Sequence, residues 1–372
     1  MSAVGEKISE TSLLRADEVI EWEHAHPFRT IVLSRYDAPS GALGAGMRRR
    51  EFIARLGGIA LLAPLAARGQ QGPKTLIGYL GSSSFNSSEK QLIGFRQGLA
   101  EVSFVEGQNL AVEYRWSDGN YDRLPAMATE LLSRGVSLIL ASGLPAALAA
   151  KAATSTTPIV FVMGADPVSS DIVPSMNRPG GNVTGISQFY GALGGKRLEL
   201  LREIVPSVIT IAVLTNPNNP NSTAHLVDVQ NVAQATGQKI VIVTAGDVTA
   251  IDNAAETLAR EQAQALLVAD DPFFTVNRER IIAIADKLRL PAIYYTREYA
   301  ADGGLISYGS STADNYRLGG VYVGRILAGA RPGELPVIQP ARFEMVINLK
   351  AAKSLKLDLS PTVIARADEV IE

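Results

Sequence analysis

The chain of 372 residues contains no cysteine and only three histidines. Without cysteine it can form no disulfide, no thiolate nucleophile, no zinc–thiolate site and no lipid-modified cysteine. His24 and His26 lie near the N-terminus, so His225 is the only histidine in the rest of the chain. One histidine offers little to a Ser-His-Asp triad or a His-rich metal site. We interpret His225, which lies in a polar stretch with a helical pattern, as a surface residue.

Charge is also nearly balanced, with 35 Lys+Arg against 37 Asp+Glu. Residues 1–69 hold nine and eight of these, so residues 70–372 hold 26 and 29 and carry a net charge of −3. This balance gives no electrostatic footprint for nucleic acid or an anionic membrane, and we predict no nucleic-acid partner. No G-x-G-x-x-G follows the first predicted strand and no G-x-S-x-G occurs. We therefore predict a protein that is not an enzyme and uses no cofactor or metal.

Residues 47–69 have the three parts of an export signal. Arg48, Arg49 and Arg50 form a basic head, residues 53–67 are mostly apolar, and small residues precede Gln70. The apolar stretch is too short to span a bilayer of about 30 Å. The arginine pair resembles a twin-arginine signal, which a receptor reads as an address. We predict export to the periplasm with cleavage near Gly69-Gln70; the alternative is a buried amphipathic helix.

The segment before the export signal contains a repeated heptapeptide. Residues 15–21 and 366–372 both read RADEVIE. No longer period accompanies the repeat, so a repeat architecture is not indicated. Our hypothesis is that residues 1–46 are the tail of an adjacent related gene, joined by read-through or a misassigned start. The alternative is a genuine disordered extension.

Apolar runs of strand length alternate with helical patterns through the rest of the chain. Helical stripes include Leu92, Phe95 and Leu99. The predicted strands are 76–80, 110–114, 138–141, 159–163, 183–186, 211–214, 240–243, 265–268, 292–295, 305–308 and 343–347. Continuous Val/Ile/Leu strands separated by helices indicate parallel sheets covered on both faces. Eleven strands are too many for one comfortable open sheet, so we predict an α/β fold with two doubly wound lobes; a TIM barrel is the alternative.

Clusters of glycine and proline mark where the chain passes between these lobes. They occur at residues 178–182, 302–304 and 332–340. Three crossings divide the chain into lobe 1, residues 74–186 plus 305–335, and lobe 2, residues 187–304 plus 340–372. Several crossings make a hinge, and a hinge makes a cleft that closes on a ligand.

The order of several segments resembles a known family. They include SGLPAALAAKAAT (142–154), PIVFVMGADPV (158–168), RPGGNVTGIS (178–187) and LPAIYYTREYAADGGLISYG (290–309). Together they resemble ABC transporter substrate-binding proteins of the periplasmic-binding-protein type I fold. They are more closely similar to the subfamily that includes tryptophan and other aromatic amino-acid receptors. The resemblance covers nearly all of residues 74–372 and implies a monomeric exported receptor that delivers a small solute to an ABC permease.

Ligands of open α/β sheets bind beyond the carboxyl ends of the strands, where backbone N–H groups at helix starts are free. A bound amino acid needs donors for its carboxylate, an acceptor for its ammonium and an apolar wall. From these loops we select Ser82, Ser83, Ser84, Phe85, Ser142, Gly143, Leu144, Pro145, Ala146, Asp166, Pro167, Asn216, Asp270, Phe273, Tyr295 and Tyr308.

Each candidate also has a structural interpretation. The serines could cap helices, the Asp-Pro pairs could form turns, and Phe273 could belong to the core. Two other functions stay open. One is a ligand sensor of the same fold that feeds a membrane signalling protein. The other is an exported hydrolase or lyase that uses Asp166 or Asp270.

Overall fold

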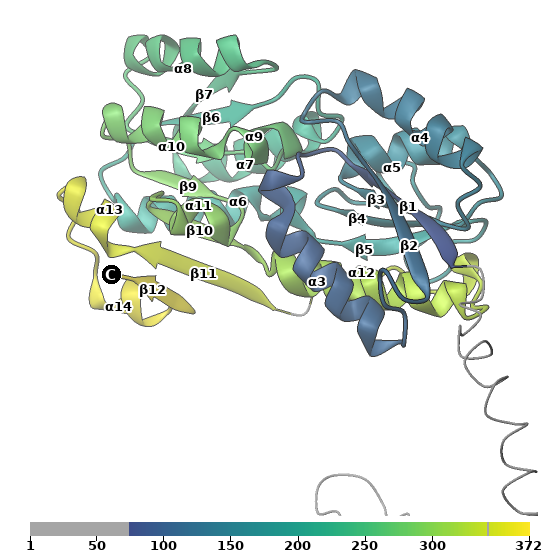
Figure 1. The fold of residues 1–372 in the computed structure, drawn as a ribbon. Helices are drawn as coiled ribbons and strands as arrows, with labels where there is room; N and C mark the ends of the chain where they lie inside the picture. Colours follow the sequence, from purple (N-terminus) through teal and green to yellow (C-terminus); the bar gives the residue numbers. More distant parts are fainter. Residues whose placement is uncertain (1–73, 341) are drawn as a thin grey trace, which may run out of the picture. The chain divides into compact units, whose positions relative to one another are not determined.

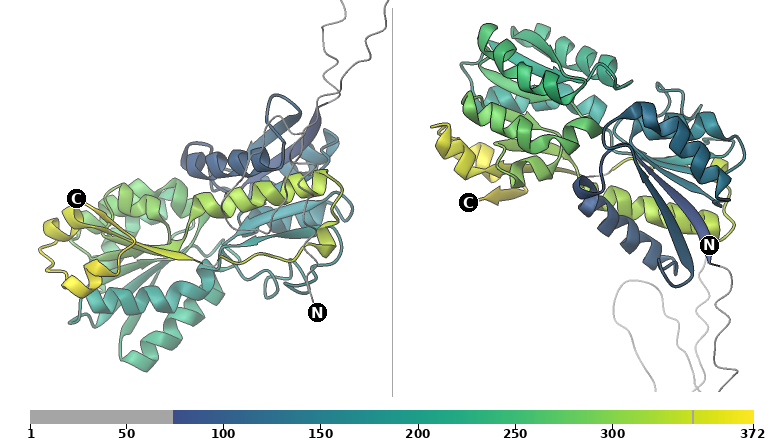
Figure 2. Two further views of the ribbon diagram at one scale, coloured as in Figure 1. Left: turned by 90° about the horizontal axis from the view of Figure 1, so that it is seen from below. Right: turned by 45° about the horizontal axis from the view of Figure 1, so that its top comes forward.

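The computed structural model describes residues 74–340 and 342–372. The predicted export signal and the segment before it lie outside these residues. The described chain forms two open α/β sheets, as predicted, and not a TIM barrel. Figures 1 and 2 show the sheets in separate lobes, each with helices on both of its faces.

Lobe 1 contains a parallel five-stranded sheet of order β2-β1-β3-β4-β5. Its strands are β1 (Thr75–Gly81), β2 (Leu110–Trp116), β3 (Ile139–Ser142), β4 (Ile159–Met163) and β5 (Val183–Ser187). Its helices are η1 (Asn86–Ser88), α3 (Glu89–Glu101), η2 (Tyr121–Arg123), α4 (Leu124–Ser133), α5 (Leu144–Ala153), α12 (Thr312–Leu327) and η4 (Pro332–Glu334).

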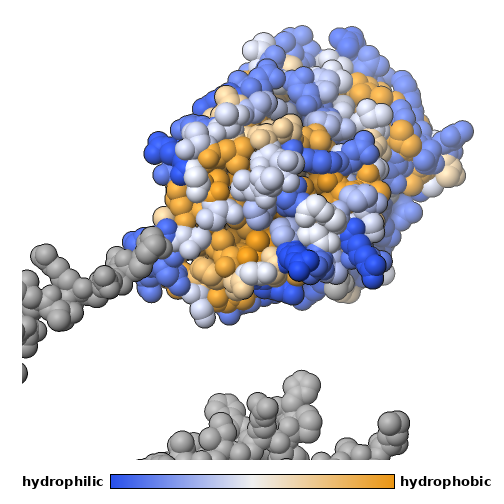
Figure 3. All heavy atoms as spheres, turned by 90° about the vertical axis from the view of Figure 1, so that its right-hand side faces the viewer, coloured by the Kyte–Doolittle hydropathy of each residue, from blue (hydrophilic) through white to orange (hydrophobic). Residues whose placement is uncertain are grey.

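The continuous apolar strands of lobe 1 are explained by burial on both faces of the sheet. Side chains alternate along a strand. Ile159, Phe161 and Met163 of β4 therefore pack under α4 and α5. Val160 and Val162 pack under α3 and α12 on the other face. Figure 3 views the molecule from its α4 and α5 side, where apolar surface shows between polar residues.

Lobe 2 contains a seven-stranded sheet of order β12-β11-β10-β9-β8-β6-β7. Its strands are β6 (Thr210–Thr215), β7 (Lys239–Thr244), β8 (Ala265–Val268), β9 (Ala292–Tyr294), β10 (Ile306–Ser310), β11 (Phe343–Asn348) and β12 (Glu369–Ile371). Its helices are η3 (Tyr190–Leu193), α6 (Gly194–Ile204), α7 (Ser222–Thr236), α8 (Val248–Arg260), α9 (Pro272–Val276), α10 (Arg278–Lys287), α11 (Arg297–Ala301), α13 (Leu349–Ser354) and α14 (Pro361–Ala365). Among the described strands, β10 and β11 form the only antiparallel pair, and β12 runs parallel to β11.

The chain crosses between the lobes after β5, after β10 and before β11. The second crossing differs from the prediction, which placed residues from 305 onward in lobe 1. β10 pairs with β9 in the seven-stranded sheet, so the crossing follows Ser310. The Gly303-Gly304 cluster that suggested a crossing instead forms a turn within lobe 2, where Gly304 lies against Tyr294. The sequence also did not predict β12, a three-residue strand within the C-terminal heptapeptide.

Glycines let α3 and α12 pack with their backbones in contact. A Cβ on Gly98 would lie 1.8 Å from the carbonyl oxygen of Arg317. Backbone atoms cannot rotate away, so the two helices would have to separate. We expect Gly98→Ala to lower the free energy of unfolding by about 1–3 kcal/mol, measured by urea denaturation. Gln97→Ala, exposed on the same helix, should change it by less than about 0.5 kcal/mol. Equal stabilities of the two variants would contradict this packing.

Candidate ligand-binding site between the lobes

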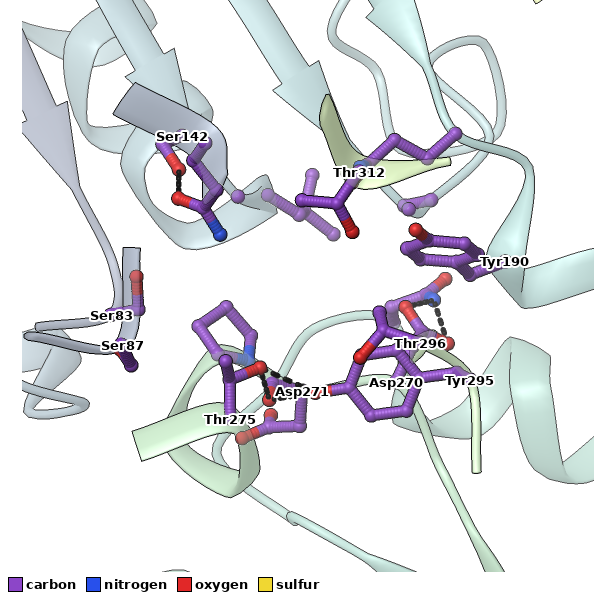
Figure 4. A pocket seen from close by; sticks show the side chains of 18 of the residues that line it. Ser83, Ser87, Ser142, Tyr190, Asp270, Asp271, Thr275, Tyr295, Thr296 and Thr312 are labelled. Carbon is purple, nitrogen blue, oxygen red and sulfur yellow. Dashed lines mark hydrogen bonds between the residues drawn. The ribbon is translucent and has the colours of Figure 1, made fainter. Parts of the chain in front are cut away.

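The carboxyl ends of the central strands in the two sheets face a common cavity of ≈ 80 Å³. Lobe 1 and the hinge contribute Ser83, Ser87, Lys90, Gln91, Ser142, Gly143, Leu144, Pro145, Gly164, Ala165, Gln188, Thr312 and Tyr316. Lobe 2 contributes Tyr190, Asn219, Asn221, Asp270, Asp271, Pro272, Thr275, Tyr295, Thr296 and Glu298. In Figure 4, Ser142 and Thr312 lie across the cavity from Asp270, Asp271 and Thr275.

The first turn of α5 forms the donor side of the cavity. Gly143, at φ 95°, turns the chain from β3 into this helix, a left-handed conformation that favours glycine. Leu144 is the first residue of α5, so its backbone N–H has no partner within the helix. Ser142 lines the same cavity, and its hydroxyl is hydrogen-bonded to the Tyr316 hydroxyl. Hydroxyls and a free N–H group at a helix start are suited to a carboxylate.

The acceptor side is built on two adjacent carboxylates that follow β8. Asp271 caps α9 by accepting from Phe274 N at 3.1 Å. It also accepts from Asn216 Nδ2 at 3.2 Å and from Asn219 Nδ2 at 2.7 Å. Burial raises the pKa of Asp271 to about 6, and these amide donors oppose the rise. Asp271 is therefore a carboxylate whose hydrogen bonds are largely satisfied by the protein.

Asp270 has fewer partners and lines the same cavity. Its only side-chain donor among the described residues is Asn221 Nδ2, at 3.3 Å and 3.5 Å from the two oxygens. Burial raises its pKa to about 7, the positive charge of Arg197 lowers it, and Asp271 raises it further. An incompletely bonded carboxylate at a cavity wall can accept hydrogen bonds from a ligand's ammonium.

Three tyrosines contribute aromatic surface to the cavity: Tyr190, Tyr295 and Tyr316. The rings of Tyr190 and Tyr295 meet edge to face, with centroids 5.7 Å apart. Both hydroxyls are held by the protein, because Tyr190 donates to Ser310 O at 2.9 Å and Tyr295 donates to Asp271 O at 2.8 Å. The rings are thereby fixed in orientation, and they can pack against an apolar ligand group.

Behind Tyr190 lies Arg197, which is fully buried. Its guanidinium donates to Tyr308 O and Tyr190 O, both at 3.0 Å. Arg197 therefore links Tyr190, which follows the first crossing between the lobes, to Tyr308 of β10, which precedes the second crossing. It also lies 3.5 Å from His225 Nε2.

The interpretation of His225 as a surface residue was wrong. His225 is 1% exposed, because Gly194 and Gly195 of α6 let α7 approach closely. Burial, together with Arg197, lowers the pKa of His225 to about 3. The imidazole is therefore neutral at physiological pH, and its Nδ1 has no hydrogen-bond partner among the described residues.

Seven of the predicted site residues line the cavity: Ser83, Ser142, Gly143, Leu144, Pro145, Asp270 and Tyr295. The others do not. Ser82 accepts from Ala146 N at 3.1 Å and thus caps α5. Ser84 is bonded to Ser87 in its own turn. Asn216 holds Asp271, and Tyr308 packs against Phe343.

Four candidates for ligand contact lie elsewhere for clear physical reasons. Asp166 is exposed, and its carboxylate accepts from Val168 N at 2.7 Å and Ser169 N at 3.0 Å. Pro167 is buried in this turn and accepts from Ile172 N at 2.9 Å through its carbonyl. Phe85 is 57% exposed and packs edge-on against Trp116, while Phe273 belongs to the core of lobe 2.

Sequence reasoning missed much of the cavity wall, including Gln188, Tyr190, Asn219, Asn221, Asp271 and Tyr316. Asn219 stands in the loop at the carboxyl end of β6 from which Asn216 was selected, and its amide group was the available signal. Asn221 stands just beyond that loop, at the start of α7. Tyr316 lies inside α12, and nothing in its local sequence indicates that this helix reaches the cavity.

The described fold and cavity define a two-lobed solute-binding protein of the periplasmic-binding-protein type I class. Residues 83–371 match the family described as ABC transporter substrate binding protein. The chain belongs to this family, whose members bind solutes and are not enzymes.

Three relatives illustrate the match. A tyrosine-binding protein of Clostridioides difficile is 25% identical over 287 residues, 76% of this chain and 82% of the relative. A conserved domain protein from Vibrio cholerae has a TM-score of 0.75 and 26% identity, over 80% of this chain and 100% of that one. An ABC domain from Streptococcus pneumoniae in complex with L-Trp has a TM-score of 0.74 and 25% identity, with the same coverage.

Proposed function

We propose that this protein is the extracytoplasmic receptor of an ABC importer, and that it binds an L-amino acid, aromatic ones above all, between its lobes. The observation that carries the proposal is Asp270. This incompletely bonded carboxylate lies across the cavity from the hydroxyl of Ser142 and the first turn of α5. The arrangement matches the two ends of an amino acid, with the ammonium at Asp270 and the carboxylate at α5.

The aromatic preference is supported by the rings of Tyr190 and Tyr295 and by the relatives that bind tyrosine and L-Trp. The cavity measures only ≈ 80 Å³, so an amino acid enters while the lobes are apart. Ligand contacts with both lobes then favour the closed arrangement. Delivery to a permease would follow, and the predicted export signal supports a location outside the cytoplasm.

A thermal-shift panel on the purified full-length chain tests the proposed ligand. It would contain amino acids from glycine to tryptophan, with sugars, nucleosides and organic acids for comparison. A ligand at a hundred times its dissociation constant should stabilise the fold by about 2.7 kcal/mol. Tyramine, which lacks the carboxylate, and 4-hydroxyphenylpropionate, which lacks the ammonium, are the matched controls for tyrosine. A shift with tyrosine but with neither control supports the proposal. A shift only with another class of solute would contradict it.

A further inference from the structure

Tyr121 connects the two lobes beside the cavity without lining it. It is the first residue of η2 in lobe 1, between β2 and α4. Its hydroxyl donates to Asp271 Oδ1 at 3.0 Å and accepts from Phe273 N at 3.2 Å, and both partners lie in lobe 2. Its ring packs against the cores of both lobes.

Atoms of the two lobes also approach each other closely around Tyr121. A Cβ on Gly119 of lobe 1 would lie 2.9 Å from Cδ2 of Phe273 in lobe 2. A Cβ on Gly143 would lie 3.2 Å from Cγ of Pro272, at the start of α9. α9 lies at the edge of its lobe next to lobe 1 (Figure 1). The lobes therefore meet in direct contact near η2 and α9.

Neither hydrogen bond of Tyr121 is needed for the fold of one lobe. When the lobes separate, Asp271 keeps its donors Asn216, Asn219 and Phe274 N, all within lobe 2. The Tyr121 hydroxyl therefore stabilises the closed arrangement specifically, and its bond to a carboxylate is of the stronger, charge-assisted kind.

We propose that Tyr121 is a positioning residue that raises ligand affinity by holding the lobes closed before the ligand binds. This inference rests on the proposed function only in assuming that the closed form is the one that retains ligand. If the closed form is populated to a fraction f, the apparent dissociation constant is the intrinsic one divided by f. Losing the Tyr121 hydroxyl lowers f and weakens binding, although the residue does not touch the ligand.

The test compares Tyr121→Phe with Tyr322→Phe. Tyr322 donates to Pro336 O at 2.7 Å within lobe 1, so its variant loses a hydroxyl without affecting the lobe contact. The chain has no cysteine, so cysteines introduced at Thr129 on α4 and Glu256 on α8, both exposed, can carry a pair of fluorophores. Single-molecule energy transfer then gives the closed fraction without ligand, and titration with L-tryptophan and L-tyrosine gives the dissociation constants.

We expect Tyr121→Phe to reduce the ligand-free closed fraction and to raise the dissociation constant by the same factor, up to about tenfold when the closed form is the minor one. Tyr322→Phe should leave both unchanged. Circular dichroism checks that each variant is folded. The proposal is overturned if Tyr121→Phe leaves the closed fraction unchanged, whatever happens to affinity. It is also overturned if the closed fraction falls while affinity stays the same. If neither amino acid binds the unmodified chain, the proposed function fails, whereas the ligand-free closed fraction still tests Tyr121.

Discussion

Replacing Asp270 with asparagine should weaken amino-acid binding by about 2–5 kcal/mol, the usual cost of removing one partner of a buried charge pair. Asparagine has nearly the same shape but no charge, so the ligand's ammonium would lose the counter-charge that Asp270 supplies. Isothermal titration with the ligand found in the thermal panel measures the loss.

Asp166→Asn is the matched control for Asp270→Asn. Both aspartates follow a strand and both fit the sequence criteria for an ammonium acceptor. Asp166, however, is exposed and bonded to its own turn, so its variant should bind within about twofold of the unmodified chain, a difference of roughly 0.4 kcal/mol. If both variants bind normally, the ammonium does not lie at Asp270 and our orientation of the ligand is wrong.

Lowering the pH should weaken ligand binding and at the same time stabilise the ligand-free protein. An ammonium needs the ionised form of Asp270, whose pKa is raised to about 7 by burial. Affinity should therefore be full above that value and fall about tenfold for each pH unit below it. Between pH 8 and pH 5 the dissociation constant should rise about a hundredfold.

The stability of the ligand-free protein changes in the opposite direction, because the folded state holds the Asp270 proton more tightly than the unfolded chain does. This stabilisation is complete below the unfolded pKa near 4 and is lost as the pH rises through about 7. Within that window the contribution of Asp270 to the free energy of unfolding should fall by roughly 1.4 kcal/mol per pH unit. Asp271, with a pKa raised to about 6, adds a change of the same sign up to that pH.

Titrations and urea unfolding from pH 5 to pH 8 measure both slopes. His225 adds a slope of the opposite sign below about pH 6.5, because the unfolded chain binds its proton there while the buried imidazole, with a pKa lowered to about 3, stays neutral. Asp270→Asn should therefore flatten the stability profile above about pH 6.5, since asparagine does not titrate. An affinity that is independent of pH would mean that the ligand does not contact an ionised Asp270.

Much of the fold could be predicted because the local pattern reports burial. The eleven predicted strands all correspond to strands, since apolar runs such as 159–163 are buried on both faces of a parallel sheet. The loops that line the cavity could also be predicted, because parallel strands place their carboxyl ends at one edge. The second crossing was misplaced because strand pairing is a non-local property: nothing within 305–310 indicates that β9 is its neighbour.

The side chains of the site could be predicted less well, since each loop offers several polar residues of one type. Ser82, Ser83 and Ser84 are equivalent in sequence, yet only Ser83 lines the cavity, because the turn assigns the other two to caps and internal bonds. His225 looked polar and exposed until two glycines on a different helix allowed α7 to cover it. The distance between two packed helices depends on the residues of both helices. The sequence of α7 alone therefore does not show how closely α6 approaches it.

The sequence by itself determined the class of fold, the family and the edge of each sheet where a ligand binds, because these follow from periodicity and from the order of segments along the chain. Only the tertiary structure decided which of two similar aspartates lines the cavity, that Arg197 is buried behind it, and that Tyr121 meets Asp271 across 150 positions of sequence. Such relations depend on which segments pack together, and packing is set by the whole chain rather than by any stretch of it.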